Sequence, residues 1–179
     1  MIGKKDKGTV VLLGILLLTL AITGGLFAYT YTTDTATISA TARTGDYAEV
    51  ADNASIEYDL YGRQRGTIPG GYLFDITRGS SYTGDLEVNV YVSNVDELQR
   101  DYGFWMLRVA LTDTDNNSVD QEGISQVLSL DNPYVTFICD DWTEARYVNV
   151  LGGTFRAFPD VHGLTGYNPL LFCQVNQAP

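Results

Sequence analysis

Oxygen-bearing side chains alternate along one polar loop of the sequence, and their spacing suggests a metal site. Asp113, Asp115 and Asn117 recur at every second position, as ligands do at the start of a calcium-binding loop. Ser118 and Ile124 then stand where such a loop has a glycine and a bidentate glutamate. The three oxygen-bearing residues are therefore the candidate Ca²⁺ ligands, and a solvated hairpin loop is the competing interpretation. We expect no other cofactor.

Side chains suited to hydrolytic chemistry are scattered, and no catalytic motif joins them. The single histidine, His162, follows no Gly-x-Ser-x-Gly motif and belongs to no His-Glu-x-x-His zinc motif. Asp140, Asp141 and Glu144 form an acidic cluster that is more typical of a solvated strand end than of a catalytic site. Lysine does not occur after Lys7, which excludes Schiff-base catalysis and lysine crosslinks from the rest of the chain. We therefore predict no enzymatic activity.

Two cysteines and two short motifs are candidates for covalent modification. Cys139 and Cys173 both lie in apolar runs typical of strands, and in an oxidising compartment such a pair is expected to form a disulfide. Two buried thiols in neighbouring strands are the alternative. Asn53 and Asn116 each begin an Asn-x-Ser sequon, so they are candidate glycosylation sites if the host organism glycosylates its exported proteins.

An uncharged apolar segment near the N-terminus predicts the compartment of everything that follows it. Residues 10–28 are long enough to cross a hydrocarbon core of ~30 Å as a helix. Lys4, Lys5 and Lys7 precede this segment, so the positive-inside rule keeps the N-terminus in the cytoplasm. The rest of the chain is then extracytoplasmic, at the cell surface or secreted.

The apolar segment has three interpretations. A signal peptide would be cleaved after Ala28, just beyond the helix-breaking Gly24 and Gly25. An uncleaved anchor would hold the protein in the cytoplasmic membrane through residues 8–29. A prepilin would be cut after Gly8 and keep the apolar helix. The chain therefore divides into a signal peptide or anchor helix at residues 1–28 and one extracytoplasmic domain at residues 29–179.

The charge balance limits the partners of the exported domain. The chain carries 11 basic and 22 acidic residues, for a formal net charge of −11. An acidic surface of this kind repels nucleic acid and anionic lipid, so we expect no nucleic-acid partner.

Beyond the N-terminal segment the apolar residues recur with the period of a β-strand. Residues 34–42 and 85–93 alternate between apolar and polar side chains, and several shorter runs follow, separated by turn residues. Gly152 and Gly153 predict a tight hairpin within residues 147–158. The expected fold is an all-β, antiparallel β-sandwich of jelly-roll or Ig-like type, preceded by one N-terminal transmembrane or signal helix.

The start of the exported domain resembles the TasA/camelysin-like secreted proteins. The matching features are Gly24-Gly25, Ala28-Tyr29, Thr33-Asp34-Thr35-Ala36 and Ile38. Residues 86–98, LEVNVYVSNVDEL, are similar to that family's strand leading into a turn that contains asparagine. The resemblance implies a jelly-roll-like β-sandwich, exported to the surface or matrix, that builds fibres by giving its N-terminal strand to the next subunit. The chain has no motif for the protease activity with which camelysin-like members are labelled.

These observations together predict a structural protein of the cell surface or matrix that assembles with copies of itself. The donated strand would contain Thr35, Thr37, Ile38 and Ala40, whose small and apolar side chains suit the open edge of a neighbour's sheet. A membrane-anchored extracellular ligand-binding module and a pilin-like subunit cleaved after Gly8 are the alternatives. An exported hydrolase is a further one, and it would need several acidic side chains to converge in one cleft.

Overall fold

The computed structural model describes residues 35–43, 47–52, 56–60, 65–113, 125–139, 146–159, 161 and 168–179. Within these ranges the chain forms eleven strands and one short helix, which confirms the predicted all-β class. The predicted N-terminal helix at residues 1–28 lies outside the described residues. In the part that is described, no helix is long and apolar enough to cross a membrane.

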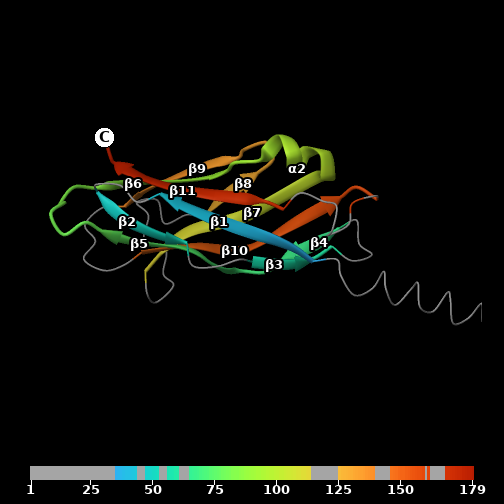
Figure 1. Cartoon of the computed structure of the whole chain (residues 1–179), viewed down its shortest axis with the longest axis horizontal. Coiled ribbons are helices and arrows are strands. Elements are labelled where there is room, and N and C mark those ends of the chain that lie inside the picture. Colours follow the sequence, from blue (N-terminus) through green and yellow to red (C-terminus); the bar gives the residue numbers. More distant parts are fainter. Residues whose placement is uncertain are drawn as a thin grey trace, which may run out of the picture. The chain divides into compact units, whose positions relative to one another are not determined.

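The first of two sheets has five strands and contains both the first and the last strand of the described chain (Figure 1). Its strand order is β3 (Ile56–Asp59), β1 (Thr35–Arg43), β11 (Leu170–Gln177), β6 (Leu86–Val92) and β9 (Tyr134–Cys139). β1 and β11 pair in parallel, whereas the other neighbours in this sheet are antiparallel. The fully antiparallel arrangement that the sequence predicted is therefore wrong at this one contact. A parallel pair needs a long connection, and here nearly the whole domain provides it.

The second sheet is built around the longest strand of the described chain. Its order is β2 (Ala48–Asp52), β5 (Gly71–Arg78), β10 (Arg146–Ala157), β7 (Tyr102–Thr112) and β8 (Gln126–Ser129), and β4 (Gly66–Ile68) also pairs with β10. The short helix α2 (Val95–Asp101) joins β6 of the first sheet to β7 of the second. The chain thus passes from one sheet to the other through a single helical connection at this point.

The predicted hairpin at Gly152-Gly153 is wrong, because β10 continues straight through it. The register of β10 against β7 shifts between Val150 and Gly152, and Gly152 has a φ of 127°, so the first glycine allows a β-bulge. A Cβ on Gly153 would lie 2.4 Å from the backbone oxygen of Met106, so the second glycine allows a close approach of β7. Two adjacent glycines are compatible with a turn and with a bulge, and only the observed strand pairing distinguishes these two structures.

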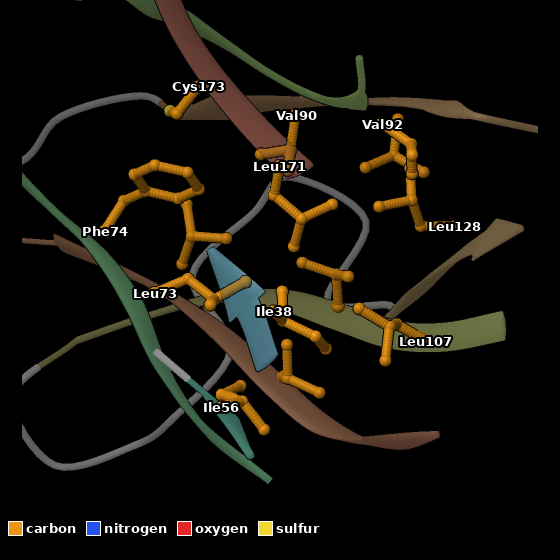
Figure 2. Close-up of a cluster of buried hydrophobic side chains, with 14 of the residues drawn as sticks. Ile38, Ile56, Leu73, Phe74, Val90, Val92, Leu107, Leu128, Leu171 and Cys173 are labelled. Carbon is orange, nitrogen blue, oxygen red and sulfur yellow. The ribbon is translucent and has the colours of Figure 1, made fainter. Parts of the chain in front are cut away.

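Alternating side chains of both sheets meet in one hydrophobic core. Figure 2 shows Ile38 and Ile56 of the five-stranded sheet in a cluster with Leu73 and Leu107 of the six-stranded sheet. Each such side chain stabilises the fold by roughly 1.5–3 kcal/mol when it is fully buried. The core therefore depends on β1, because Ile38 is one of its completely buried members.

Candidate functional site: the N-terminal strand

β1 changes its hydrogen-bonding neighbour half-way along its length. Residues 35–38 pair with residues 59–56 of β3, and residues 39–43 pair with residues 170–174 of β11. Among the described strands, no residue of β1 therefore has a ladder partner on both sides. Each half of β1 is held by one ladder. The first half pairs through the edge that faces β3, and the second half pairs through the opposite edge, which faces β11.

The four predicted donor residues all lie in β1, but they play different parts. Ile38 is completely buried, and Ala36, its neighbour on the same face, is 1% exposed. Ala40 is partly buried and packs against the core. Thr35 is exposed and Thr37 is half-buried, so both belong to the outer face. The alternation read from the sequence is thus confirmed, and the apolar face of β1 is the one that enters the core.

The segment before β11 continues the hydrogen bonding of β1 beyond the regular ladder. The side-chain oxygen Oδ1 of Asn168 accepts a hydrogen bond from the Thr37 amide at 3.2 Å. The carbonyl of Pro169 accepts another from the Ser39 amide at 3.0 Å. In the sequence, Asn168-Pro169 indicates a turn only, so this contact with β1 was not predicted.

A buried asparagine fixes the position of that segment. The Nδ2 of Asn94 donates to the carbonyl of Asn168 at 2.8 Å, and its Oδ1 accepts from the amide of Leu170 at 3.0 Å. Asn94 precedes α2, so the connection between the sheets also holds the start of β11. An asparagine is suited to this place because its amide group both donates and accepts.

On its other side, β1 is bordered by β3, whose central tyrosine reaches across the core. The hydroxyls of Tyr58 and Tyr102 share a hydrogen bond of 2.9 Å, and Tyr102 lies at the start of β7 in the second sheet. The ring of Phe155, on β10, lies 5.0 Å from the ring of Tyr58 and 6.1 Å from that of Tyr102, between centroids. These contacts connect β3 to the six-stranded sheet.

The tyrosine pair remains neutral over the whole physiological range. Burial raises the pKa of Tyr58 far above its usual value, and the neighbouring Tyr102 raises it further. Burial also raises the pKa of Tyr102, against the opposing effect of its hydrogen bond with Tyr58. Both groups can therefore act as hydroxyl donors and acceptors, but not as bases. Neither residue was assigned a role from the sequence, since nothing in the pattern showed that β3 and β7 meet.

The predicted disulfide between Cys139 and Cys173 is absent from the structure, and the register of β6 explains why. Both thiols are buried, but Cys173 pairs with Val90 on one side of β6 and Cys139 pairs with Leu86 on the other. Two strand spacings of about 5 Å and four residues of about 3.4 Å each separate the two cysteines. A disulfide needs Cα atoms within about 7 Å, so this fold excludes an intrachain bridge.

The remaining predicted site residues do not form a site in the part of the chain that is described. Asp113 is half-buried after β7, whereas Asp115, Asn117 and the two sequon asparagines, Asn53 and Asn116, lie outside the described residues, as do His162 and the Asp140–Glu144 cluster. No group of three or more His, Cys, Asp or Glu residues gathers as metal ligands within the described ranges.

A small depression lies beside the start of β7, with a volume of about 130 Å³. Its walls include Gln99 of α2, Phe104 and Trp105 of β7, and Asp131 after β8. This set brings the Asp131 carboxylate and the Ser129 hydroxyl next to aromatic and amide groups, and it contains neither a histidine nor a cysteine. The Ser129 hydroxyl accepts a hydrogen bond from the Asn132 amide at 3.0 Å.

Comparison with known proteins gives no family for this chain. No protein-family model matches the sequence, and no curated protein matches it significantly. The placement of β1 is thus the feature on which a functional proposal rests.

Proposed function

We propose that this chain is a non-enzymatic, exported structural subunit of the cell surface or matrix, which assembles with copies of itself by exchanging β1. The two sheets are then the layers of a jelly-roll-like β-sandwich, a view supported by the single core to which both contribute. A β1 from a neighbouring copy makes the same backbone ladders and buries the same Ala36 and Ile38. Exchange therefore costs little at equilibrium and links one subunit to the next.

The observation that carries the proposal is the one-sided pairing of β1. Each of its residues has a strand partner either on β3 or on β11, so withdrawal of β1 breaks one ladder at each point, together with the side-chain hydrogen bond from the Thr37 amide to Asn168. Its position also favours donation, because β1 is the first strand of the described chain. Cleavage after Ala28 would leave only residues 29–34 before Thr35 and free this strand to move.

A disulfide between β1 and β11 tests the proposal, because the chain already provides one of the two thiols. Position 42 is the ladder partner of Cys173, so Ala42→Cys places two cysteines opposite each other on neighbouring strands. A self-contained subunit would form this disulfide within one chain. A strand-exchanged assembly would form it between chains, and non-reducing electrophoresis would show a ladder of covalent oligomers.

The expected result is a series of covalent oligomers on the gel whose size increases with the length of the filaments in electron micrographs of the same sample. The matched control is Ala40→Cys, because position 40 faces Leu171 rather than a cysteine and yields no crosslink across the ladder. A protein that remains monodisperse at high concentration, and forms the Ala42→Cys disulfide only within the chain, would refute strand exchange.

A further inference from the structure

We propose that Tyr58 holds β3 in place as a wall of the slot that β1 leaves, so that the slot stays open to β1 of a second copy. This inference rests on the proposed strand exchange and deepens it. The slot is defined here as the space between β3 and β11 that β1 fills. Tyr58 is thus a positioning residue in the acceptor, the subunit that receives a foreign β1. It has no role in the donor, the subunit that provides β1.

The backbone of β3 depends entirely on β1 within the described sheet. Each of the four residues from Ile56 to Asp59 pairs with a residue of β1, and β3 is the end strand of its sheet. When β1 withdraws, β3 loses every ladder hydrogen bond at once. A strand of four residues that has lost its ladder keeps its position only if its side-chain contacts hold it.

Two side chains of β3 reach the other sheet, and neither contact involves β1. Tyr58 joins the hydroxyl of Tyr102 on β7 and the ring of Phe155 on β10. Ile56 is buried against β5, where a Cβ added to Gly71 would come within 3.3 Å of its Cγ1. These contacts survive the departure of β1, so they are able to preserve the slot.

The hydrogen bond between the Tyr58 and Tyr102 hydroxyls fixes the position of β3 relative to β7. A ring contact alone tolerates sliding and rotation, whereas a hydrogen bond of 2.9 Å between two buried hydroxyls fixes the distance between β3 and β7. Loss of one hydroxyl also leaves the other buried without its partner, which adds to the cost. Tyr58→Phe therefore loosens β3 while it retains the aromatic packing.

A purely structural role for Tyr58 predicts the opposite effect on strand exchange. If Tyr58 only stabilised the closed subunit, Tyr58→Phe would release β1 more readily and speed the acceptance of a foreign strand. If Tyr58 keeps the emptied slot open, the same change slows acceptance. The sign of the effect therefore distinguishes the two roles.

Two versions of the full exported protein measure acceptance alone. The donor carries Ala42→Cys with Cys173→Ala, and the acceptor keeps the native Ala42 and Cys173. Because positions 42 and 173 are ladder partners, a disulfide between the two versions reports β1 of the donor in the slot of the acceptor. A mixture without Ala42→Cys measures the background from Cys139. Tyr58→Phe is placed in the acceptor in one experiment and in the donor in another.

We expect Tyr58→Phe in the acceptor to lower the initial rate of mixed-disulfide formation by about fivefold, in keeping with the loss of one buried hydrogen bond. The same change in the donor leaves the rate unchanged. Tyr102→Phe in the acceptor reproduces the loss, and the double variant adds little to it. Tyr91→Phe, a change of the same kind on the outer face of β6, serves as the matched control.

The outcomes distinguish a failure of the role of Tyr58 from a failure of the proposed strand exchange. An unchanged or faster rate with Tyr58→Phe in the acceptor, beside a normal mixed disulfide with native Tyr58, refutes the role of Tyr58 and leaves strand exchange standing. Absence of any mixed disulfide with native Tyr58 overturns strand exchange, and the inference with it.

Discussion

β1 and β10 are both interior strands of their sheets, yet they are held in different ways. β10 pairs with β7 along nearly its whole length, and on its other side with β5 and then β4. β1 pairs with β3 over its first half and with β11 over its second. β10 is thus enclosed by two ladders, whereas β1 has one at each point. Under the proposed strand exchange, the six-stranded sheet is the lasting framework and β1 is the exchangeable element.

The two strands also differ in how closely their neighbours approach. β10 has a bulge at Gly152 and a backbone contact at Gly153 that no other residue type permits. β1 contributes Ala36 and Ile38, which any strand with a similar alternation could replace. Changes in β10 should therefore prevent folding, and changes in β1 should be reparable by a second copy of the strand.

The largest expected effect is that of Gly153→Ala. The new Cβ would lie 2.4 Å from the Met106 backbone oxygen and 2.7 Å from a methyl group of Leu107, so β7 and β10 would have to move apart. We expect a loss of about 4 kcal/mol in unfolding free energy, or no folded protein, in urea denaturation followed by circular dichroism.

Gly84→Ala is the matched control for this change. The three atoms nearest to its Cβ would all belong to the side chain of Tyr82, whose hydroxyl oxygen would lie 2.5 Å away, and the far end of a side chain can move aside. We expect a loss below about 1 kcal/mol. Equal losses at Gly84 and Gly153 would contradict the view that β10 is held by close backbone contact.

The next largest effect is expected at Ile38, the completely buried residue of β1. Ile38→Ala should cost about 3 kcal/mol of unfolding free energy, because it leaves a cavity between the sheets. Thr37→Ala, on the outer face, is the control, and it should change stability by less than about 0.5 kcal/mol.

A peptide of residues 35–43 with native Ile38 extends this test. At millimolar concentration it competes with the chain's own β1, and it should restore part of the lost stability. The same peptide should have no effect on the Gly153→Ala variant. Lack of rescue of Ile38→Ala would show that β1 is no more exchangeable than β10.

The local pattern of the sequence predicted much of the fold, because strand alternation depends on neighbouring residues. The apolar positions of residues 85–93 became the buried face of β6, and Ala36 and Ile38 became that of β1. The all-β class followed from the same period. The predicted donor residues also fell on one strand, with Ile38 in the core.

The sheet order could not be predicted in the same way, because it depends on contacts between distant residues. The parallel pairing of β1 with β11, the path of β10 through Gly152 and the separation of Cys139 from Cys173 all follow from that order. The Tyr58–Tyr102 contact is likewise a product of two strands meeting across the core. None of these long-range features can be recognised from the spacing of residues along the chain.

A smaller effect is expected at high pH, and it acts on the wall of the slot formed by β11. Burial raises the pKa of the Cys173 thiol from 9.0 to about 12, so the folded state favours the neutral thiol. Its contribution is complete below pH 9, where the thiol is neutral in both states. The contribution is lost as the pH rises from 9 towards 12, because the thiol ionises in the unfolded chain first.

The unfolding free energy should therefore fall above pH 9, with a slope from this group that approaches about 1.4 kcal/mol per pH unit. Urea denaturation between pH 8 and pH 10 measures the slope. Cys173→Ala should reduce the slope, because it removes the thiol, whereas the contribution of the buried tyrosines is lost only as the pH rises above their ordinary pKa of about 10. A slope that is identical in both proteins would mean that Cys173 is not kept neutral by the fold.

The smallest effect is expected at Asn168, whose side chain extends the hydrogen bonding of β1. Asn168→Ala removes the acceptor of the Thr37 amide, and because this contact is exposed to water the cost should be about 0.5–1 kcal/mol. Asn132→Ala, which removes an exposed hydrogen bond to the carbonyl of Val127 in β8, should cost a similar amount. Amide hydrogen exchange separates the two variants: only Asn168→Ala should speed exchange at Thr37, and neither should affect the amides of β10. If β10 amides exchanged faster in step with that of Thr37, the two strands would open together, and the one-sided pairing of β1 would not make it separately removable.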